Sequence, residues 1–335
     1  MPDYEAALSR LQALAPRVMA HWNIAPRELR LVKFRENAVF RVDAQDGLSY
    51  ALRIHRLGYH SDEALHSELQ WMNALQEAGV DVPRLVPAAC GRLFVKAGTG
   101  RNGDEAQVDL FEWIDGRTLG SSDEGVGGQL AHIVETYRTV GGIAARLHNQ
   151  ATSWRLPAGF QRHSWDIDGL VGDEPLWGRF WELEALTPSE RELLLAAREH
   201  VRAGLLSFAA SVDPGECYSL IHADFVPENL MLANGKVRLL DFDDAGFGWH
   251  LFDLATALWF IQNDPHYEAA RDALVAGYRE HRALPDELLA ALPVFMMARG
   301  FTYLGWVHTR PASREARELT PHLVELACSF AKRLL

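Results

Sequence analysis

The sequence is poor in the residues that would place it in a specialised structural class. Only three cysteines occur among 335 residues, and they are widely separated along the chain: Cys90, Cys217 and Cys328. Such a set does not suit a disulfide framework or a zinc site, so we expect free or buried thiols and a reducing, cytoplasmic location. We find no low-complexity segment and no internal repeat. The composition, 48% hydrophobic and 23% charged, is ordinary for a globular protein.

The chain also lacks an excess of basic residues and any long apolar run. It has 33 basic and 45 acidic residues, which gives a formal net charge of −12. Nonspecific nucleic-acid binding needs a basic face, so we expect no nucleic-acid partner, although a local nucleotide site remains compatible with this charge. The N-terminal residues MPDYEAALSRLQAL lack the regions of a signal peptide, and no apolar run reaches membrane-spanning length. We therefore expect no membrane partner. The length favours two lobes over one small core.

The most informative segment that is present spans residues 220–244, with the sequence LIHADFVPENLMLANGKVRLLDFDD. Its pattern predicts a strand, a loop and a hairpin, at residues 217–221, 222–228 and 229–240. Asn234-Gly235 is a strong signal for the hairpin turn. Because a hairpin reverses the chain, we expect Asp241 to return to the neighbourhood of Asn229.

This arrangement would gather the polar groups that phosphoryl transfer requires. A carboxylate and an amide oxygen, at Asp241 and Asn229, suit Mg²⁺, whose remaining ligands would be water and phosphates. Asp224 lies on the same loop and can face an incoming hydroxyl group. Asp and Asn are also common in turns, and we keep that interpretation for Asn234. It does not explain why three polar groups end one apolar strand pair.

The spacing resembles the catalytic core of the protein-kinase-like phosphotransferases. That core has the pattern His-x-Asp-x-x-x-x-Asn and then an aspartate that opens a DFG-like triplet; here the two motifs read HADFVPEN and DFD. The superfamily includes aminoglycoside phosphotransferases, choline kinases and type II homoserine kinases. The resemblance implies a bilobal α+β fold. We place a small antiparallel-sheet lobe with one helix at 1–112 and a larger, mainly helical lobe at 113–335.

The resemblance also implies a role for each residue of the segment. Asp224 would be the catalytic aspartate, and His222 would brace its loop. Asn229 and Asp241 would hold Mg²⁺. Asp253, in FDLA, would tie the catalytic loop to the next helix.

Asp243 is a weaker metal candidate. The triplet Asp243-Asp244-Ala245 resembles the DDA of bacterial stress-response kinases. In that comparison Asp243 would assist a second metal ion. A turn cap explains Asp243 equally well.

The amino-terminal part alternates between apolar and polar residues as strands do. We expect strands at 31–34, 39–42, 49–54, 93–95 and 107–111, with one helix after Ser61, its N-cap. Arg53 lies on the third strand, where kinases place a phosphate-binding lysine, and Glu68 lies where they place its partner. An exposed arginine and a solvated glutamate are the alternative.

Two further features concern the nucleotide. The turn at 35–38 contains no glycine and resembles the Glu-Asn turn of some small-molecule and stress-response kinases; Asn37 is a candidate side-chain donor to phosphate. By resemblance, the backbone of Glu112 and Ile114 would bond the adenine edge. Trp113, between them, is assigned to packing.

The acceptor site is the least determined part. Residues 160–181 are rich in tryptophan and arginine, and the superfamily builds acceptor pockets from insertions of this kind. We therefore assign Arg162, Trp165 and Asp166 to that site, with pinning of a long loop as the alternative. Arg299 lies in an apolar helical run and needs an anionic partner, so it is a candidate anchor for an acceptor carboxylate or phosphate.

One histidine and three hypotheses complete the interpretation. His148 is expected to be a capping or surface residue. The first hypothesis is an Mg²⁺-dependent ATP phosphotransferase acting on a small hydroxyl acceptor such as homoserine, an amino alcohol or an aminoglycoside. A protein serine/threonine kinase of the stress-response type is the second, supported by the Glu-Asn turn and the DDA triplet. The third is a pseudokinase binding module, supported by the glycine-free turn and Arg53.

Overall fold

The computed structural model describes residues 2–34, 37–98, 104–120 and 129–335. Contacts divide the chain into two units. The first unit contains Met1–Arg117, Arg155–Arg162 and Leu232–Leu240, and the second contains Thr118–Trp154, His163–Met231 and Asp241–Leu335. The main division thus follows Arg117, five residues beyond the boundary expected from the sequence, and two later segments return to the first unit.

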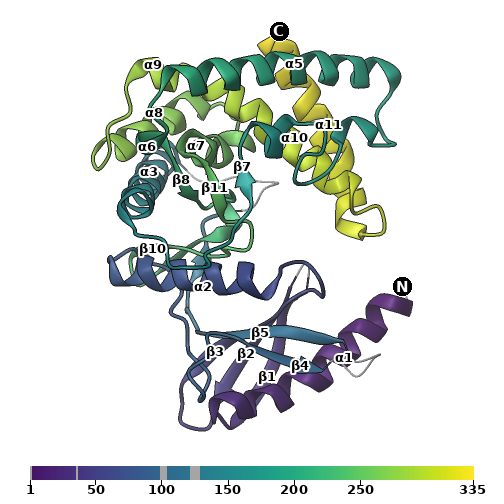
Figure 1. The fold of residues 1–335 in the computed structure, drawn as a ribbon, viewed down its shortest axis with the longest axis vertical. Helices are drawn as coiled ribbons and strands as arrows, with labels where there is room; N and C mark the ends of the chain where they lie inside the picture. Colours follow the sequence, from purple (N-terminus) through teal and green to yellow (C-terminus); the bar gives the residue numbers. More distant parts are fainter. Residues whose placement is uncertain (1, 35–36, 99–103, 121–128) are drawn as a thin grey trace. The chain divides into compact units, whose positions relative to one another are not determined.

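The first unit is built on a five-stranded antiparallel sheet in the order β1-β2-β3-β5-β4 (Figure 1). Its strands are β1 (Pro26–Phe34), β2 (Ala38–Ala44), β3 (Ser49–Ile54), β4 (Val95–Gly98) and β5 (Glu105–Glu112). Strand β2 alternates buried and half-buried residues, which is the signature of a sheet with one face on the core. The α+β class and the number of strands in this sheet are confirmed. Strand β1 begins five residues earlier than expected, and β4 lies at 95–98 instead of 93–95.

Helix α2 (Asp62–Glu77) follows β3, as the sequence predicted. The Ser61 side chain accepts a hydrogen bond from the backbone N–H of Ala64 at 3.1 Å, and acidic residues occupy the first turn. The buried face of the helix carries Glu68 among apolar residues. The glycine-free turn lies partly outside the described residues, because Arg35 and Glu36 are not among them.

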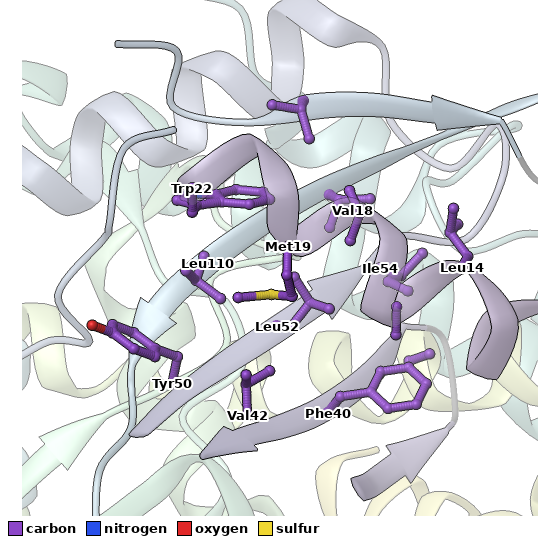
Figure 2. Close-up of a cluster of buried hydrophobic side chains, with 14 of the residues drawn as sticks. Leu14, Val18, Met19, Trp22, Phe40, Val42, Tyr50, Leu52, Ile54 and Leu110 are labelled. Carbon is purple, nitrogen blue, oxygen red and sulfur yellow. The ribbon is translucent and has the colours of Figure 1, made fainter. Parts of the chain in front are cut away.

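A helix that the sequence interpretation missed covers one face of this sheet. Helix α1 (Pro2–Val18) continues into the 3₁₀ turn η1 (Met19–Trp22). Figure 2 shows the side chains that it packs against the strands: Leu14, Val18, Met19 and Trp22 on the helical side, and Phe40, Leu52, Ile54 and Leu110 on the sheet. The apolar spacing of Leu14, Val18 and Trp22, four residues each, is the signal that predicts such a helix.

The second unit is mainly helical. Its long helices are α3 (Leu130–Ser153), α5 (Pro188–Ser211), α7 (His250–Trp259), α8 (Tyr267–Arg279), α10 (Leu292–His308) and α11 (Arg314–Leu334). Shorter elements are α4 (Ile167–Val171), η2 (Phe180–Glu182), α6 (Pro214–Cys217), η3 (Pro227–Asn229) and α9 (Asp286–Leu289). Thr187 and Glu190 form the expected capping box at the start of α5.

Two small sheets hold the segment that carries Asp224 and Asn229. Strands β7 (Ser164–Trp165), β8 (Tyr218–Ile221) and β11 (Gly246–Trp249) pair in the order β7-β11-β8. Strands β6 (Arg117–Thr118), β9 (Leu230–Ala233) and β10 (Lys236–Leu239) pair in the order β10-β9-β6. Asn234 and Gly235, between β9 and β10, have φ values of 52° and 74°. Both therefore adopt the left-handed conformation that a tight hairpin requires.

One stretch, Asp286–His308, is long and apolar enough to cross a membrane by length and composition, and 61% of its most apolar window is buried within the protein. A core helix of a folded domain meets the same criteria. The stretch contains α10, whose buried residues include Arg299.

Candidate active site

The loop that carries Asp224 is fixed by a buried carboxylate. Strand β8 ends at Ile221, and the Asp253 carboxylate accepts hydrogen bonds from the next two backbone N–H groups, those of His222 (3.0 Å) and Ala223 (2.7 Å). Ala223 has a φ of 64°, a conformation that residues with a Cβ rarely adopt. The two bonds to Asp253 stabilise this bend, which directs the chain toward Asp224.

His222 supports the same loop from within. It is completely buried, and its ring packs edge-on against Phe225 and Phe242, with centroids 5.2 and 4.6 Å away. The backbone N–H of Asp224 donates to Nδ1 of His222 at 3.2 Å. Because Phe242 lies between Asp241 and Asp243, the His222 ring joins the loop of Asp224 to the DFD triplet.

The Asp224 carboxylate is held on both of its oxygens. Asn229 donates its amide nitrogen to Oδ2 at 2.6 Å and to the Asp224 carbonyl oxygen at 3.0 Å. Arg299 donates from Nη2 to Oδ1 at 2.6 Å. The Asp224 side chain is nevertheless 21% exposed, whereas that of Arg299 is completely buried. The structure therefore presents a partly accessible carboxylate that is anchored by two less accessible partners.

The carboxylates around Asp224 create a strongly negative region that fits a divalent cation. Asp241 is exposed, at a left-handed φ of 63°, and Asp243 is buried. Burial raises the pKa of Asp244 well above its ordinary value, and the charges of Asp224, Asp243 and Asp241 raise it further. Asn229 turns its amide nitrogen toward Asp224, so its amide oxygen is the group left to ligate a cation. Oxygen donors of this kind suit Mg²⁺.

His148 corrects one expectation from the sequence. It is completely buried rather than a capping or surface residue, and its Nε2 lies 3.0 Å from Asp253 Oδ2. Burial and the charge of Arg282 hold the pKa of His148 well below its ordinary value, so the ring is neutral. A neutral ring that donates from Nε2 to Asp253 accepts at Nδ1, where the Tyr278 hydroxyl lies at 2.9 Å. The i, i+4 series Val140, Ala144 and His148 on α3 places His148 on a buried helix face.

The first unit holds a separate cluster around Arg53. Its Nη2 donates to Glu68 Oε1 at 2.7 Å and to Asp109 Oδ2 at 2.8 Å, and its Nε reaches both Asp109 oxygens at 3.1 and 3.2 Å. All three side chains are buried. The structure thus brings together the Arg53–Glu68 pair that the sequence suggested, and adds a second carboxylate that sequence reasoning missed.

Asp109 also binds His55, whose Nε2 lies 2.8 Å from Asp109 Oδ2. Burial alone would raise the pKa of Asp109, but the charges of Arg53 and His55 outweigh it and hold that pKa below its ordinary value. Arg53 is paired with Asp109 across β3 and β5. The available signal is the spacing of two residues between Arg53, on β3, and His55, just beyond its end, since side chains two apart project from one face of a sheet.

Some of the other residues that the sequence assigned to nucleotide binding already make contacts within the protein. Asn37 accepts a hydrogen bond from the Arg56 backbone at its Oδ1, 3.2 Å away. The backbone N–H of Glu112 donates to the Arg84 carbonyl at 2.8 Å, so it is already engaged within the protein. Ile114 is half-buried. Trp113 is stacked under the Arg41 guanidinium at 4.9 Å, in line with its assignment to packing.

The three acceptor candidates of the 160–181 segment occupy different environments. Arg162 belongs to the first unit and donates to Ala64 O at 3.2 Å and to Glu68 Oε2 at 3.4 Å. Trp165 is fully buried in the second unit and donates to the Asp244 carbonyl at 2.9 Å. Asp166 caps α4 by accepting from Gly169 N at 2.8 Å. These contacts fit the alternative in which the segment is pinned to its surroundings.

Comparisons with known proteins agree with this geometry. A family model described as the phosphotransferase enzyme family matches residues 29–288. The solved structure of a microcompartment-associated aminopropanol kinase is 33% identical, covers 95% of this chain and 96% of that chain, and superposes with a TM-score of 0.82. Amicoumacin kinase from Bacillus subtilis (strain 168) is 24% identical over 318 residues, which are 91% of this chain and 87% of that relative. A structure of amicoumacin kinase hAmiN in complex with AMP-PNP, Ca²⁺ and Ami shares the fold, with a TM-score of 0.75 at 19% identity over 99% of this chain and 96% of that chain.

Proposed function

Because the chain belongs to the phosphotransferase enzyme family and is a kinase that acts on a hydroxyl group, we propose that it transfers the γ-phosphoryl group of ATP, with Mg²⁺, to a small amino alcohol. The observation that carries this proposal is the Asp224 carboxylate, partly exposed yet held by Asn229 and Arg299. A carboxylate that orients a hydroxyl group must be accessible to the acceptor and must also be held in a fixed position.

In the proposed reaction Asp224 accepts a hydrogen bond from the acceptor hydroxyl. The hydroxyl oxygen forms a bond to the γ-phosphorus as the bond from that phosphorus to the leaving oxygen of ADP breaks, and the hydroxyl proton passes to Asp224. The transition state of such transfers is loose, so the main contribution of Asp224 is orientation rather than basicity. Magnesium, held by the Asn229 amide oxygen and Asp241, would neutralise phosphate charge. Arg53, oriented by Glu68 and Asp109, would contact the phosphates.

The acidic surroundings of Asp224 support an acceptor that carries an ammonium group. The negative charges of Asp224, Asp243 and Asp241 outweigh the positive charge of Arg299 in their effect on Asp244, so the region favours cations over anions. The similarity to the aminopropanol kinase structure extends over nearly the whole of both chains and points to the same acceptor class.

The protein-kinase alternative is less well supported by the local structure. Strand β11 (Gly246–Trp249) runs directly into α7 (His250–Trp259), and Asp253 lies in the first turn of that helix. The segment from Asp244 to Asp253, all of it described, therefore has no room for a long regulated loop. A small-molecule acceptor fits this arrangement better.

The proposal is tested by incubating the protein with MgATP and a panel of acceptors while ADP is measured. The panel contains 1-aminopropan-2-ol, ethanolamine, homoserine, an aminoglycoside and casein. We expect turnover with an amino alcohol, and Asp224→Asn should lower that turnover by roughly 10²–10⁴-fold. Asp168→Asn, at an exposed aspartate, is the matched control and should keep full activity. Turnover of casein alone, or full activity in Asp224→Asn, would contradict the proposal.

A further inference from the structure

We propose that Arg299 is a positioning residue that holds the Asp224 carboxylate in its working orientation, with Tyr303 as its support. This inference rests on the proposed function. It differs from the sequence-based expectation, in which Arg299 anchors an anionic group of the acceptor. The distinction is chemical: a positioning residue acts through Asp224, whereas an anchor acts on the acceptor itself.

The contact between Arg299 and Asp224 is short and supported from the same helix. Nη2 of Arg299 donates to Asp224 Oδ1 at 2.6 Å and to the Tyr303 hydroxyl oxygen at 2.7 Å. Tyr303 lies four residues after Arg299 on α10, so both side chains project from one face of the helix. Two acceptors on one guanidinium nitrogen restrict its position, and thereby that of Oδ1.

Aromatic rings enclose the guanidinium group. Its central carbon lies 4.1 Å from the ring centroid of Tyr303, 5.2 Å from that of Trp177 and 5.7 Å from that of Phe252. The Arg299 side chain is completely buried. An acceptor anchor would have to be reached by solute, and this guanidinium is not accessible. Its route to the reaction is the carboxylate that it binds.

The energetics also favour a functional role. Nε and Nη1 of Arg299 are buried and make no hydrogen bond to any described residue, so the guanidinium is only partly satisfied. Replacing a buried ion pair by apolar residues of similar volume is often neutral or stabilising. A buried arginine with two unpaired donors is therefore a poor device for stability. The hydrogen bond that its third nitrogen, Nη2, donates to Asp224 is a better explanation for its presence.

The charge of Arg299 is maintained despite burial. Burial lowers the pKa of its guanidinium, but Tyr303 and Asp224 outweigh this effect, and the net shift is upward. Arg299 is thus a permanent cation beside Asp224, in a region crowded with the carboxylates of Asp241, Asp243 and Asp244. Its attraction opposes the repulsion that would turn the Asp224 carboxylate away from its neighbours.

The first experiment separates effects on kcat from effects on acceptor KM in Arg299→Met. We expect kcat to fall by about 10²-fold, since a misplacement of about 1 Å at a reacting group has consequences of that size. The acceptor KM and the MgATP dissociation constant should stay within about twofold of wild type, because the Arg299 side chain is completely buried and would act only through Asp224. The matched control is Arg310→Met, at an arginine that also stacks on a tryptophan, Trp306, at 5.0 Å; it should retain wild-type kcat.

Two further variants separate positioning from a structural role. In the Asp224→Asn background, adding Arg299→Met should cause no further loss of kcat, because residues that act as a unit are not additive. Tyr303→Phe keeps the ring and removes the hydroxyl, so a smaller loss in kcat is expected. A raised acceptor KM with unchanged kcat in Arg299→Met would overturn the proposal in favour of an acceptor anchor. The proposal would also be overturned if Arg299→Met lowered kcat in the Asp224→Asn background as much as it does in the wild-type background.

A crystal structure of Arg299→Met gives a result that does not depend on activity. We expect the Asp224 carboxylate to rotate away from its wild-type orientation or to occupy more than one. An unchanged single orientation would overturn the positioning role even if the acceptor panel finds no substrate. Failure of the panel alone would count against the proposed function and leave this structural result to decide the role of Arg299.

Discussion

At the scale of single residues, Asp253 shows how one buried carboxylate organises groups that are distant in sequence. It accepts from the backbone of His222 and Ala223 and contacts the His148 ring. Burial raises its pKa from 3.8 to about 6, although His222 and the two backbone bonds act in the opposite direction. The carboxylate that binds the loop of Asp224 therefore has a pKa much closer to neutrality than an exposed aspartate does.

This shift predicts a pH dependence of stability. The folded state binds the Asp253 proton more tightly than the unfolded state, whose pKa is near 3.8, so between about pH 4 and pH 6 the folded state holds more protons. The contribution of Asp253 to the free energy of unfolding therefore falls as pH rises through that window. The fall should be on the order of 3 kcal/mol, since each pKa unit corresponds to about 1.4 kcal/mol.

The test compares wild type with Asp253→Asn, which cannot titrate. In urea unfolding between pH 4 and pH 7, the stability of the variant relative to wild type should improve as pH rises. Glu287→Gln, at an exposed position, is the control and should show a constant difference. A constant difference for Asp253→Asn as well would show that this carboxyl does not titrate in the window.

The residues that could be found from the sequence share one property: their spacing within a short segment carries the signal. Asp224, Asn229 and Asp241 fall in that class. Asp109 and His148 do not, because each acquires its role from a partner at least 50 residues away, Arg53 and Asp253 respectively. No local pattern in a single sequence encodes such a pairing.

At the scale of elements, the contact between α3 and α8 depends on glycine at the crossing. A Cβ atom on Gly277 would lie 1.9 Å from the Arg138 carbonyl oxygen, and one on Gly141 would lie 1.9 Å from the Leu274 carbonyl oxygen. The obstructing atoms are backbone, so the two helices would have to separate. Helix α3 carries His148 and helix α8 carries Tyr278, so this crossing brings the two side chains together.

Gly277→Ala should therefore destabilise the protein. We expect the free energy of unfolding to fall by roughly 1–3 kcal/mol or more, as in other overpacked sites. Gly142→Ala is the matched control: its Cβ would meet the His281 side chain at 3.4 Å, an ordinary contact, and alanine favours helix by up to about 1 kcal/mol. Thermal unfolding of both variants measures the difference. Equal midpoints for the two would contradict the close crossing.

Helices and strands could be predicted where a regular spacing of apolar residues coincides with a residue that marks the end of the element. Helix α2 has a capping serine and an apolar stripe, and β3 has the bounds that its alternation suggests. Helix α1 was not predicted, although the buried residues Leu14 and Val18 recur at helical spacing. The start of β1 was misplaced because its outer residues are exposed and polar. Such residues pair with β2 through the backbone, which side-chain patterns do not report.

At the scale of the whole molecule, the charge balance bears on how the nucleotide is held. The formal net charge is −12. Arg53 contributes no surplus positive charge, since the carboxylates of Glu68 and Asp109 both bind it. Arg162 offsets the charge of one of these carboxylates, that of Glu68. Under the proposed function, phosphate charge would be neutralised mainly by the divalent cation. Nucleotide binding should then depend on Asp241 and Asn229 more than on any basic side chain.

MgATP should consequently stabilise the wild-type protein, and Asp241→Ala should abolish that effect. A ligand at 100 times its dissociation constant stabilises a folded protein by about 2.7 kcal/mol, which thermal unfolding detects readily. Chelating magnesium with EDTA should remove the shift from wild type and leave Asp241→Ala unchanged. Asp224→Asn is the control, because the proposed role of Asp224 is toward the acceptor and not the nucleotide, and it should keep the full shift. A shift in Asp241→Ala equal to that of wild type would refute the metal assignment, whereas no shift in wild type would refute ATP as the phosphoryl donor.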